Sequence, residues 1–275
     1  MKNIDDSDSQ LFKDTPEVLY KYRSLSEDGF EFTRNIFLKN ELYFPHPKQI
    51  NDPFDCKIPP SFKNVTKESL IACIEKVESK NYGINAAQIE AARNNVNCHD
   101  IETLIEAMRK QDEKGHRENA GVLSLSEKWS NILMWSHYAD SHRGICIGFD
   151  FTKLLFVFNG TPFPALAVKY PELNDYPLWE YLDDDHGAIF NKQYLTKALD
   201  WEYEREWRVV LPEKGRTSQE FEPAAIVSVH LGCQISERHK ENVVNWCLQR
   251  EQKPRIYETA KDESSYSLQE KEITY

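Results

Sequence analysis

The sequence predicts an α+β fold with a mixed or split β-sheet core, flanking helices and a helical insert. Short segments rich in β-branched and aromatic residues recur along the chain and are bounded by turn-forming residues. At about residues 66–118 the composition changes to Glu, Lys, Asn, Ala and Gln with helical spacing, which indicates the insert. With 275 residues, of which 40% are hydrophobic, the chain can bury a substantial core, so we expect one domain at 15–275.

The first part of the chain is typical of a strand, a helix and a second strand. Residues 1–14 are acidic and polar, and we expect a flexible tail there. Val18–Arg23 has the composition of a strand, residues 25–38 show the helical spacing of Phe and Ile, and Glu41–Phe44 reads as a short strand.

The segment NDPFDC favours a turn. Asn51 precedes Asp52 and Pro53, and Asp55 can accept hydrogen bonds from the amides that follow it. Two interpretations are open: a purely structural turn, or a turn in which Asp52 or Asp55 anchors an arginine or a ligand hydroxyl.

Strands and helices alternate in the rest of the chain. We expect SNILMWSHYAD to form a short helix capped by Ser130 or Asn131, with Met134, His137 and Tyr138 on one face. The other expected elements are strands at 121–125, 144–149, 165–170, 206–211 and 225–231, helices at 181–199 and 236–252, and a C-terminal hairpin with its turn at 261–265.

Composition and charge exclude several classes of protein. The formal net charge of −11 argues against binding nucleic acid mainly by neutralising phosphates. The six cysteines are scattered without a CxxC pair, so neither a zinc knuckle nor a small disulfide framework is indicated, and we expect reduced thiols. No apolar run approaches the ~20 residues of a membrane helix, and the first residues do not resemble a signal peptide. We therefore expect a cytoplasmic protein without membrane contact.

The segment Gly121–Asp150 concentrates polar and aromatic side chains that no simple core pattern requires. Ser124 and Ser126 alternate along a strand and share one face. His137 is a hydrogen-bonded orienting group, a group that contacts a phosphate or ribose, or a satisfied interior histidine. Trp135 is more often a packing residue than a stacking one. The segment is a candidate site whose ligand the residues alone do not identify.

A second candidate is WEYEREWRVV. Strand alternation would place Glu202, Glu204 and Glu206 on one side, where close carboxylates raise the pKa of at least one of them. If the chain is helical up to Glu204, only Glu204 and Glu206 remain candidates. Arg23, beside Tyr22 on the first strand, is suited to bidentate contact with a phosphate or carboxylate.

Together these segments resemble a known family. LYKYRSL, LYFPHPKQINDPFDC, MWSHYADSHRGICIGFD and WEYEREWRVV resemble a widespread bacterial family catalogued as a domain of unknown function, from about Leu19 to Gly232. More distantly, the order of Arg23, Ser124–Ser126 with Tyr138, and Glu204 with Glu206 resembles the ADP-ribosyltransferases, whose split sheet binds NAD.

The second resemblance implies an NAD-consuming transferase that needs no metal. It would be a toxin or phage-defence effector that acts on a cytoplasmic macromolecule, with a neutralising antitoxin-like partner. Arg23 would hold the pyrophosphate, an aromatic ring would stack on nicotinamide, and a glutamate would stabilise the oxocarbenium-like ribose. The expected catalytic residues are Glu204, Glu206 and His137, and the expected cofactor-binding residues are Arg23, Tyr22, Ser124, Ser126, Trp135, Tyr138 and Arg143.

Two alternatives come from other classes of protein. One is a metal-dependent hydrolase or nuclease that uses Asp52, Asp55, His137 and His142. The other is a non-enzymatic module that binds a nucleotide or a protein segment without turnover.

Overall fold

The computed structural model describes residues 15–80, 83–114, 119–172, 178–182 and 185–274, and these form an α+β fold, as predicted. The tail expected at 1–14 lies outside the described residues. Within the described residues no helix is long and apolar enough to cross a membrane.

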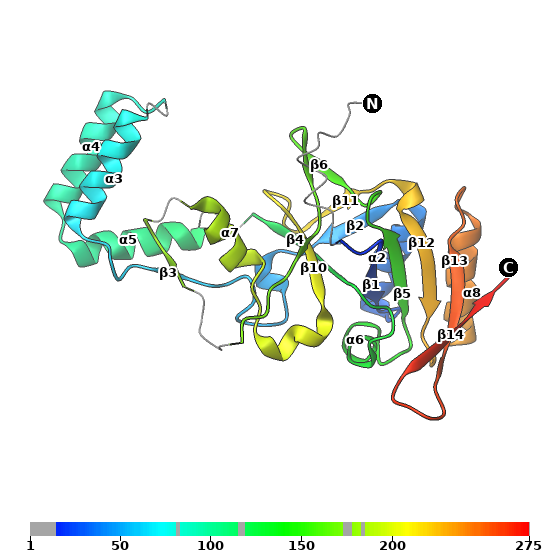
Figure 1. Ribbon diagram of the computed structural model, residues 1–275. Helices are drawn as coiled ribbons and strands as arrows, with labels where there is room; N and C mark the ends of the chain where they lie inside the picture. The colour runs from blue at the N-terminus through cyan, green and yellow to red at the C-terminus, as the bar shows by residue number, and fades with distance from the viewer. Residues whose placement is uncertain (1–14, 81–82, 115–118, 173–177, 183–184, 275) are drawn as a thin grey trace.

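A mixed β-sheet forms the centre of the molecule (Figure 1). Among the described residues it has eight strands, and β12 and β13 pair in parallel while the other neighbours pair antiparallel. In spatial order the strands are β14 (Leu268–Ile273), β13 (Arg255–Lys261), β12 (Ile226–Leu231), β5 (Ile145–Asp150), β1 (Val18–Arg23), β4 (Gly121–Ser126), β10 (Glu206–Leu211) and β8 (Leu166–Ala167).

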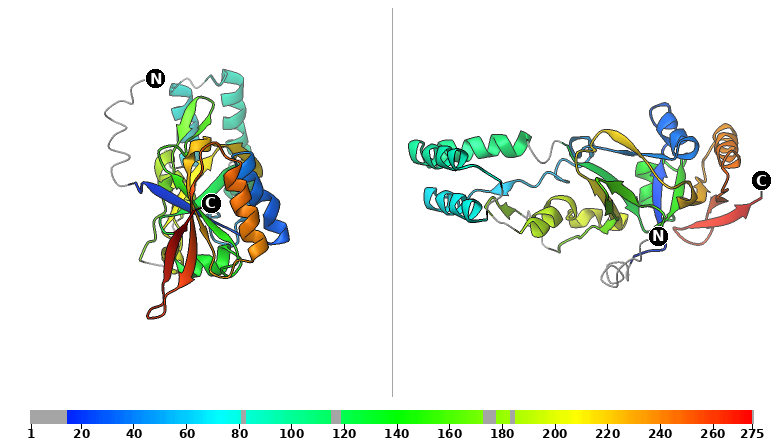
Figure 2. Two further views of the ribbon diagram at one scale, coloured as in Figure 1. Left: turned by 90° about the vertical axis from the view of Figure 1, so that its right-hand side faces the viewer. Right: turned by 90° about the horizontal axis from the view of Figure 1, so that it is seen from above.

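Two long helices cover one face of this sheet. α2 (Glu27–Leu38) and α8 (Glu237–Leu248) lie side by side in both views of Figure 2, and the rings of Phe37 and Trp246 are 5.7 Å apart. Beneath them the main core includes Leu19, Leu123 and other buried residues of β1, β4, β5, β10 and β12. We call this the α2–α8 face of the sheet.

The opposite face carries shorter elements: α6 (Ile132–Tyr138), α7 (His186–Tyr194) and the 3₁₀ helix η2 (Leu199–Glu204). Asn131 caps α6, because its side chain accepts from the amides of Leu133 and Met134. Tyr22 on β1 packs edge-on against Trp135 of α6, with ring centroids 5.4 Å apart. We call this the α6 face.

Smaller pairs of strands and short helices complete the chain. They are β2 (Glu41–Phe44) with β11 (Thr217–Glu220), β3 (Pro60–Ser61) with β9 (Trp179–Glu180), β6 (Phe156–Phe158) with β7 (Thr161–Phe163), and the 3₁₀ helices η1 (Pro47–Gln49) and η3 (Pro223–Ala225).

The main sheet has little pairing between β1 and β4. The recorded register of these strands is the single pair Tyr20 and Ser126, whereas β1 pairs with β5 at six positions. Lys21 lies next to this gap, and its Nζ donates to the carbonyl of Ser124 at 2.6 Å. Burial lowers the pKa of Lys21 to about 8. A half-buried lysine therefore links β1 to β4 where the strand ladder does not.

The helical insert is confirmed as an arm that projects from the sheet (Figures 1 and 2). Its helices are α3 (Lys67–Ser79), α4 (Ala86–Cys98) and α5 (Ile101–Lys114). Capping boxes begin α3 at Thr66 and α4 at Asn85. A separate small core includes Leu70, Val96 and Leu104, so the arm buries its own apolar side chains.

The helix expected at 181–199 is wrong in extent. α7 begins after Asp185, which caps it, and ends at Tyr194. The chain then pairs with the segment expected as a strand at 165–170: the amide of Lys169 donates to Leu195, and the amide of Lys197 donates to Lys169. This tertiary pairing competes successfully with the helical propensity of the segment.

Strand alternation at Glu202 is also wrong. Residues up to Glu204 belong to η2, Arg205 adopts a left-handed backbone with φ 42°, and the strand begins at Glu206. Glu202 is exposed, so only Glu204 and Glu206 remain candidates. On α6 the face shared by Met134, His137 and Tyr138 is not buried along its whole length, because His137 is exposed while Met134 and the neighbouring Trp135 are buried.

Gly148 provides a test of this packing. A Cβ at Gly148 on β5 would lie 2.2 Å from the Oγ of Ser228 and 3.1 Å from Tyr20. Gly148→Ala should therefore lower the free energy of unfolding by about 1–3 kcal/mol. Gly187→Ala is the control, since its Cβ would come no closer than 3.4 Å to a neighbouring atom. The melting temperatures of the two variants are measured by circular dichroism. Equal values would contradict this packing.

Candidate active site

Five charged side chains form a buried cluster on the α6 face. They are Asp55, Lys197, Glu204, Glu206 and Arg208, and each side chain is 5% exposed or less. They come from the NDPFDC turn, the segment after α7, the end of η2 and strand β10. We call them the charge cluster. Burying charges costs free energy unless they are paired, so these contacts decide which groups are held firmly.

Arg208 is the most fully bonded member. Its Nη1 and Nη2 donate to the two carboxylate oxygens of Asp55 at 2.8 and 2.6 Å. Its Nε and Nη2 donate to the two oxygens of Glu206 at 2.7 and 2.8 Å. Nη1 also donates to the carbonyl of Tyr194 at 2.8 Å. All five N–H groups thus have acceptors, and two carboxylates are held in bidentate geometry.

Lys197 holds the remaining carboxylate. Its Nζ lies 2.5 Å from Oε2 of Glu204, 3.1 Å from Oε2 of Glu206 and 3.7 Å from Oδ2 of Asp55. The same ammonium sits 4.8 Å from the ring centroid of Trp201. Burial acts to lower the pKa of Lys197, but Glu206 and Glu204 raise it well above its usual range. This lysine therefore stays charged inside the cluster.

The two glutamates occupy opposite electrostatic environments. Burial raises the pKa of Glu204, with Lys197 opposing and Glu206 adding to the rise. Burial also acts to raise the pKa of Glu206, but Arg208 and Lys197 together hold it well below its usual range. Glu206 is therefore held as an anion by its neighbours. Glu204 is the carboxyl group that takes up a proton more readily.

Local backbone geometry positions Glu204. The left-handed turn at Arg205 ends η2 directly after it. Ser126 Oγ donates to the Glu204 carbonyl at 2.6 Å, and Tyr138 Oη donates to Glu204 Oε1 at 2.7 Å. The side chain of Asn51 lies close enough to Tyr138 to oppose the rise that burial causes in the pKa of Tyr138. The NDPFDC turn, α6 and η2 thus meet at one carboxylate.

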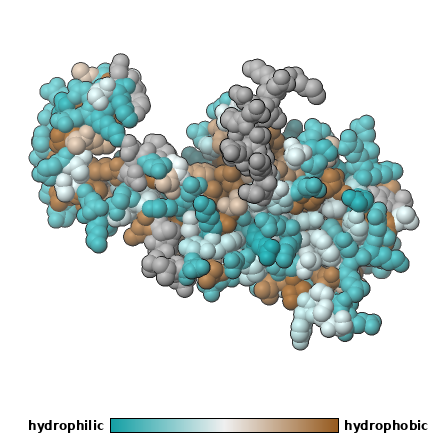
Figure 3. Space-filling model, in the orientation of Figure 1, coloured by the Kyte–Doolittle hydropathy of each residue, from teal (hydrophilic) through white to brown (hydrophobic). Residues whose placement is uncertain are grey.

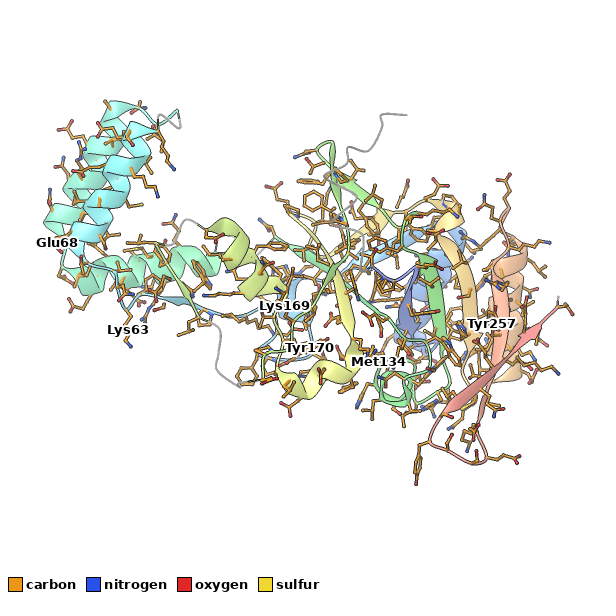
Figure 4. All side chains as sticks on the ribbon, in the orientation of Figure 1. Lys63, Glu68, Met134, Lys169, Tyr170 and Tyr257 are labelled. Carbon is orange, nitrogen blue, oxygen red and sulfur yellow. The ribbon has the colours of Figure 1, made fainter. Side chains whose placement is uncertain are left out.

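A series of aromatic rings extends from Tyr138, which donates to this carboxylate. His137 lies 6.2 Å from Tyr138 and 6.4 Å from Tyr203 between ring centroids, and Tyr203 lies 6.0 Å from Trp201. His137 is exposed and the other three rings are half-buried. We call these four residues the aromatic rim. Tyr170, labelled in Figure 4 together with Met134 of α6, accepts from the amide of Glu206 at 2.9 Å.

The structure brings several predicted site residues together here. Ser126 donates to the main-chain carbonyl of Glu204, Tyr138 donates to its carboxylate, and His137 lies beside Tyr138. Ser124 lies close enough to Glu206 to lower the pKa of that carboxyl. The second interpretation of NDPFDC holds, because Asp55 anchors Arg208. The turn itself is an Asx turn in which Asp52 Oδ1 accepts from the amide of Phe54 at 2.8 Å.

Other predicted cofactor-binding residues do not lie with Glu204. Arg23 belongs to the α2–α8 face, where its Nε donates to Thr33 of α2, because alternation separates it from Tyr22. Tyr22 and Trp135 are 5% and 0% exposed, and both donate to carbonyls, of Lys128 and Trp129. This supports the packing interpretation of Trp135 and extends it to Tyr22.

Arg143 is likewise separate. It is exposed and pairs with Asp140 in the turn after α6, with Nη2 2.8 Å from Oδ1. The ligand set expected for a metal is not assembled either: Asp55 is bound by Arg208, and His142 lies near Cys233. Among the described residues, no group of three or more His, Cys, Asp or Glu side chains is placed to hold a metal.

Lys197 is the member of the charge cluster that the sequence did not indicate. It follows a helix that ends earlier than expected, and its contacts depend on pairing with residue 169 and on strand β10. The only available signal was a lysine next to the aromatic segment of WEYEREWRVV, which is weak.

Removing one charge of the cluster tests its structural role. Glu206→Gln removes a buried anion that Arg208 and Lys197 both contact, so it should lower the free energy of unfolding by about 3–5 kcal/mol in urea titrations. Glu202→Gln is the matched control, because Glu202 is exposed. A loss no greater than that of the control would show that Glu206 is not structural.

Acid should remove the same stabilisation. A carboxylate whose pKa is lowered by folding contributes stability above its unfolded value, here 4.5, and loses it as pH falls further. The difference in unfolding free energy between wild type and Glu206→Gln should therefore shrink as pH falls below about 4.5. A difference that stays constant from neutral pH to the acid limit of folding would contradict this.

Comparisons with known proteins bear on this region. Residues 134–209 match a family model described as "Protein of unknown function (DUF2971)", and the match includes Tyr138, Lys197, Glu204, Glu206 and Arg208. Asp55 and the other quoted segments outside 134–209 are not part of it. No curated protein and no solved structure gives a significant match. Residues 134–209 are therefore similar to the DUF2971 family of unknown function, which confirms that resemblance over this part of the chain.

Proposed function

We propose that the protein is an NAD-consuming, ADP-ribosyltransferase-like enzyme with Glu204 as its catalytic carboxylate. The observation that carries this proposal is the position of Glu204. It is a buried carboxylate with a raised pKa, it is not bonded to Arg208, and it lies next to the aromatic rim.

The residues present fit the chemistry of NAD. Nicotinamide in NAD is a cationic ring, and aromatic faces attract such a cation. Cleavage of its glycosidic bond leaves positive charge on the ribose, which a carboxylate in a water-poor site stabilises strongly. The rim and Glu204 supply these two groups within one set of contacts.

The two phosphates of NAD require cations. Arg23 is on the other face of the sheet, so we assign this role to Arg205. Its side chain is 53% exposed and directly follows Glu204 in the chain, and its ion pair with Glu127 is long at 3.9 Å. Such a weakly paired, solvent-exposed guanidinium is available for bidentate contact with phosphate.

The reaction then needs no group beyond these residues. Nicotinamide leaves with the electron pair of the glycosidic bond while Glu204 stabilises the developing cation on the ribose. The acceptor forms the new bond to the ribose and releases its proton to solvent. Lys197 and Tyr138 keep the Glu204 carboxylate in position during the reaction, so these residues contribute by orienting the reacting groups. The acceptor proposed is a cytoplasmic macromolecule, as for a toxin or defence effector with a neutralising partner.

The measurement is release of nicotinamide from NAD by the purified protein. Glu204→Gln should reduce release by at least about 10²-fold, since removal of one transition-state electrostatic contact commonly costs that much. It should destabilise the fold less than Glu206→Gln, because its neighbours Lys197 and Glu206 keep their mutual contact.

Glu202→Gln is the control, and it should release nicotinamide at the wild-type rate. A shift in melting temperature with NAD but no release would favour a nucleotide-binding module. The proposal would be contradicted if NAD caused no shift in melting temperature and no nicotinamide were released.

A further inference from the structure

A concave site lies on a side of α6 away from the charge cluster. It is a pocket of about 620 Å³ between α6, the turn after β12 and the hairpin β13–β14. Its lining includes Ile132, Leu133, His142, Cys233 and Lys261. None of its lining residues belongs to the charge cluster or the aromatic rim. In Figure 3 apolar surface lies over the region of α6, next to the paler turn of the hairpin.

A thiol and an imidazole meet in this pocket. Cys233 Sγ lies 3.8 Å from Nδ1 of His142, and the thiol is free and partly exposed. Ser136 Oγ lies 3.4 Å from Nε2 of the same ring and itself donates to the carbonyl of Ile132 at 2.8 Å. Because the Ser136 proton is used in that bond, its oxygen accepts from Nε2–H. Nδ1 is then the unprotonated nitrogen, and it faces the thiol.

The backbone holds His142 in an unusual conformation. Asp140, Ser141 and His142 are successive left-handed residues with φ of 49°, 51° and 67°. Left-handed backbone is disfavoured for residues other than glycine. His142 is fixed there by its amide, which donates to Trp135, and by its carbonyl, which accepts from Gln234. Strain of this kind concentrates at functional sites.

The approach of the two segments depends on a glycine. A Cβ at Gly232, directly before Cys233, would come 2.1 Å from the carbonyl of His142. Only a residue without a side chain allows the strand end to pass this close. Left-handed backbone at His142 and a required glycine at position 232 therefore both occur where Cys233 meets His142.

The charges favour a thiol that is activated by a base. Burial raises the pKa of Cys233, with Lys261 opposing the rise, and burial lowers the pKa of His142. Both groups are then neutral near pH 7, so the thiol keeps its proton until the imidazole removes it.

We propose that Cys233 and His142 form a second reactive site, at which the thiol accepts an acyl group from a small thioester or activated ester. Ile132 and Leu133, 38% and 43% exposed, provide an apolar wall for the acyl chain. The Lys261 ammonium lies close enough to affect both groups and suits an anionic leaving group.

The step balances without a further reactant. As Sγ bonds to the carbonyl carbon, its proton passes to Nδ1 of His142. The bond to the leaving thiolate or alkoxide breaks, and the leaving group takes that proton with the electron pair of the broken bond. Water or another acceptor then attacks the thioester, gives its proton to the same imidazole and regenerates the thiol. This activity is independent of the proposed use of NAD.

The test uses the full chain and 4-nitrophenyl butyrate, with the site of acylation mapped by peptide mass spectrometry. Cys233 should be acylated at least about tenfold faster than Cys73 and Cys98, which are exposed and serve as internal controls. Equal or slower labelling of Cys233 would overturn the proposal without any variant.

A matched variant isolates the base. His142→Asn keeps a residue type that tolerates left-handed backbone, so the turn can be retained. Acylation at Cys233 should fall by about 10²-fold or more in this variant, while labelling of Cys73 and Cys98 is unchanged. Wild-type acylation at Cys233 in the folded variant would overturn the role of His142. Nicotinamide release by the same variant should equal that of wild type.

Discussion

The guanidinium of Arg208 is the interaction on which the rest of the site depends. It binds Asp55 from a turn 153 residues earlier in the chain, Glu206 on its own strand and the carbonyl that ends α7. Removing such a group from water is costly, and only complete pairing offsets the cost. Arg208 can therefore be buried only when the NDPFDC turn, the end of α7 and strand β10 pack together and supply its acceptors.

This pairing also separates the two glutamates. Arg208 occupies both oxygens of Glu206, so that carboxylate is fixed as an anion. Glu204, two residues earlier, lies beyond the left-handed turn at Arg205 and contacts Lys197 and Tyr138 instead. One strand and one turn thus place two chemically identical groups in opposite environments, with the more changeable one next to the aromatic rim.

The sequence predicted those elements of the fold that local sequence patterns determine. The helical arm, the Asx turn and most of the expected strands follow from periodicity, capping and turn chemistry, and they appear close to the expected residues. The strand expected at 165–170 is reduced to Leu166–Ala167. It could not predict the face on which Arg23 lies relative to Glu204, because that depends on strand order. Lys197 was missed for a similar reason, since pairing with residue 169 stops α7 early and turns the lysine inward. Residue type alone could not decide whether Trp135 packs in the core or stacks on a ligand, because a sequence does not distinguish a buried tryptophan from an exposed one.

The most direct test of this account is a titration of the glutamate side-chain carboxyl carbons by NMR, with Glu204 and Glu206 assigned from their Gln variants. The account predicts that Glu204 titrates above the usual glutamate value, whereas Glu206 remains ionised down to the pH at which the protein unfolds. If both carboxyls titrated at the usual value, or if Glu206 titrated above Glu204, the cluster would not hold them apart, and the assignment of Glu204 as the reactive carboxylate would fail.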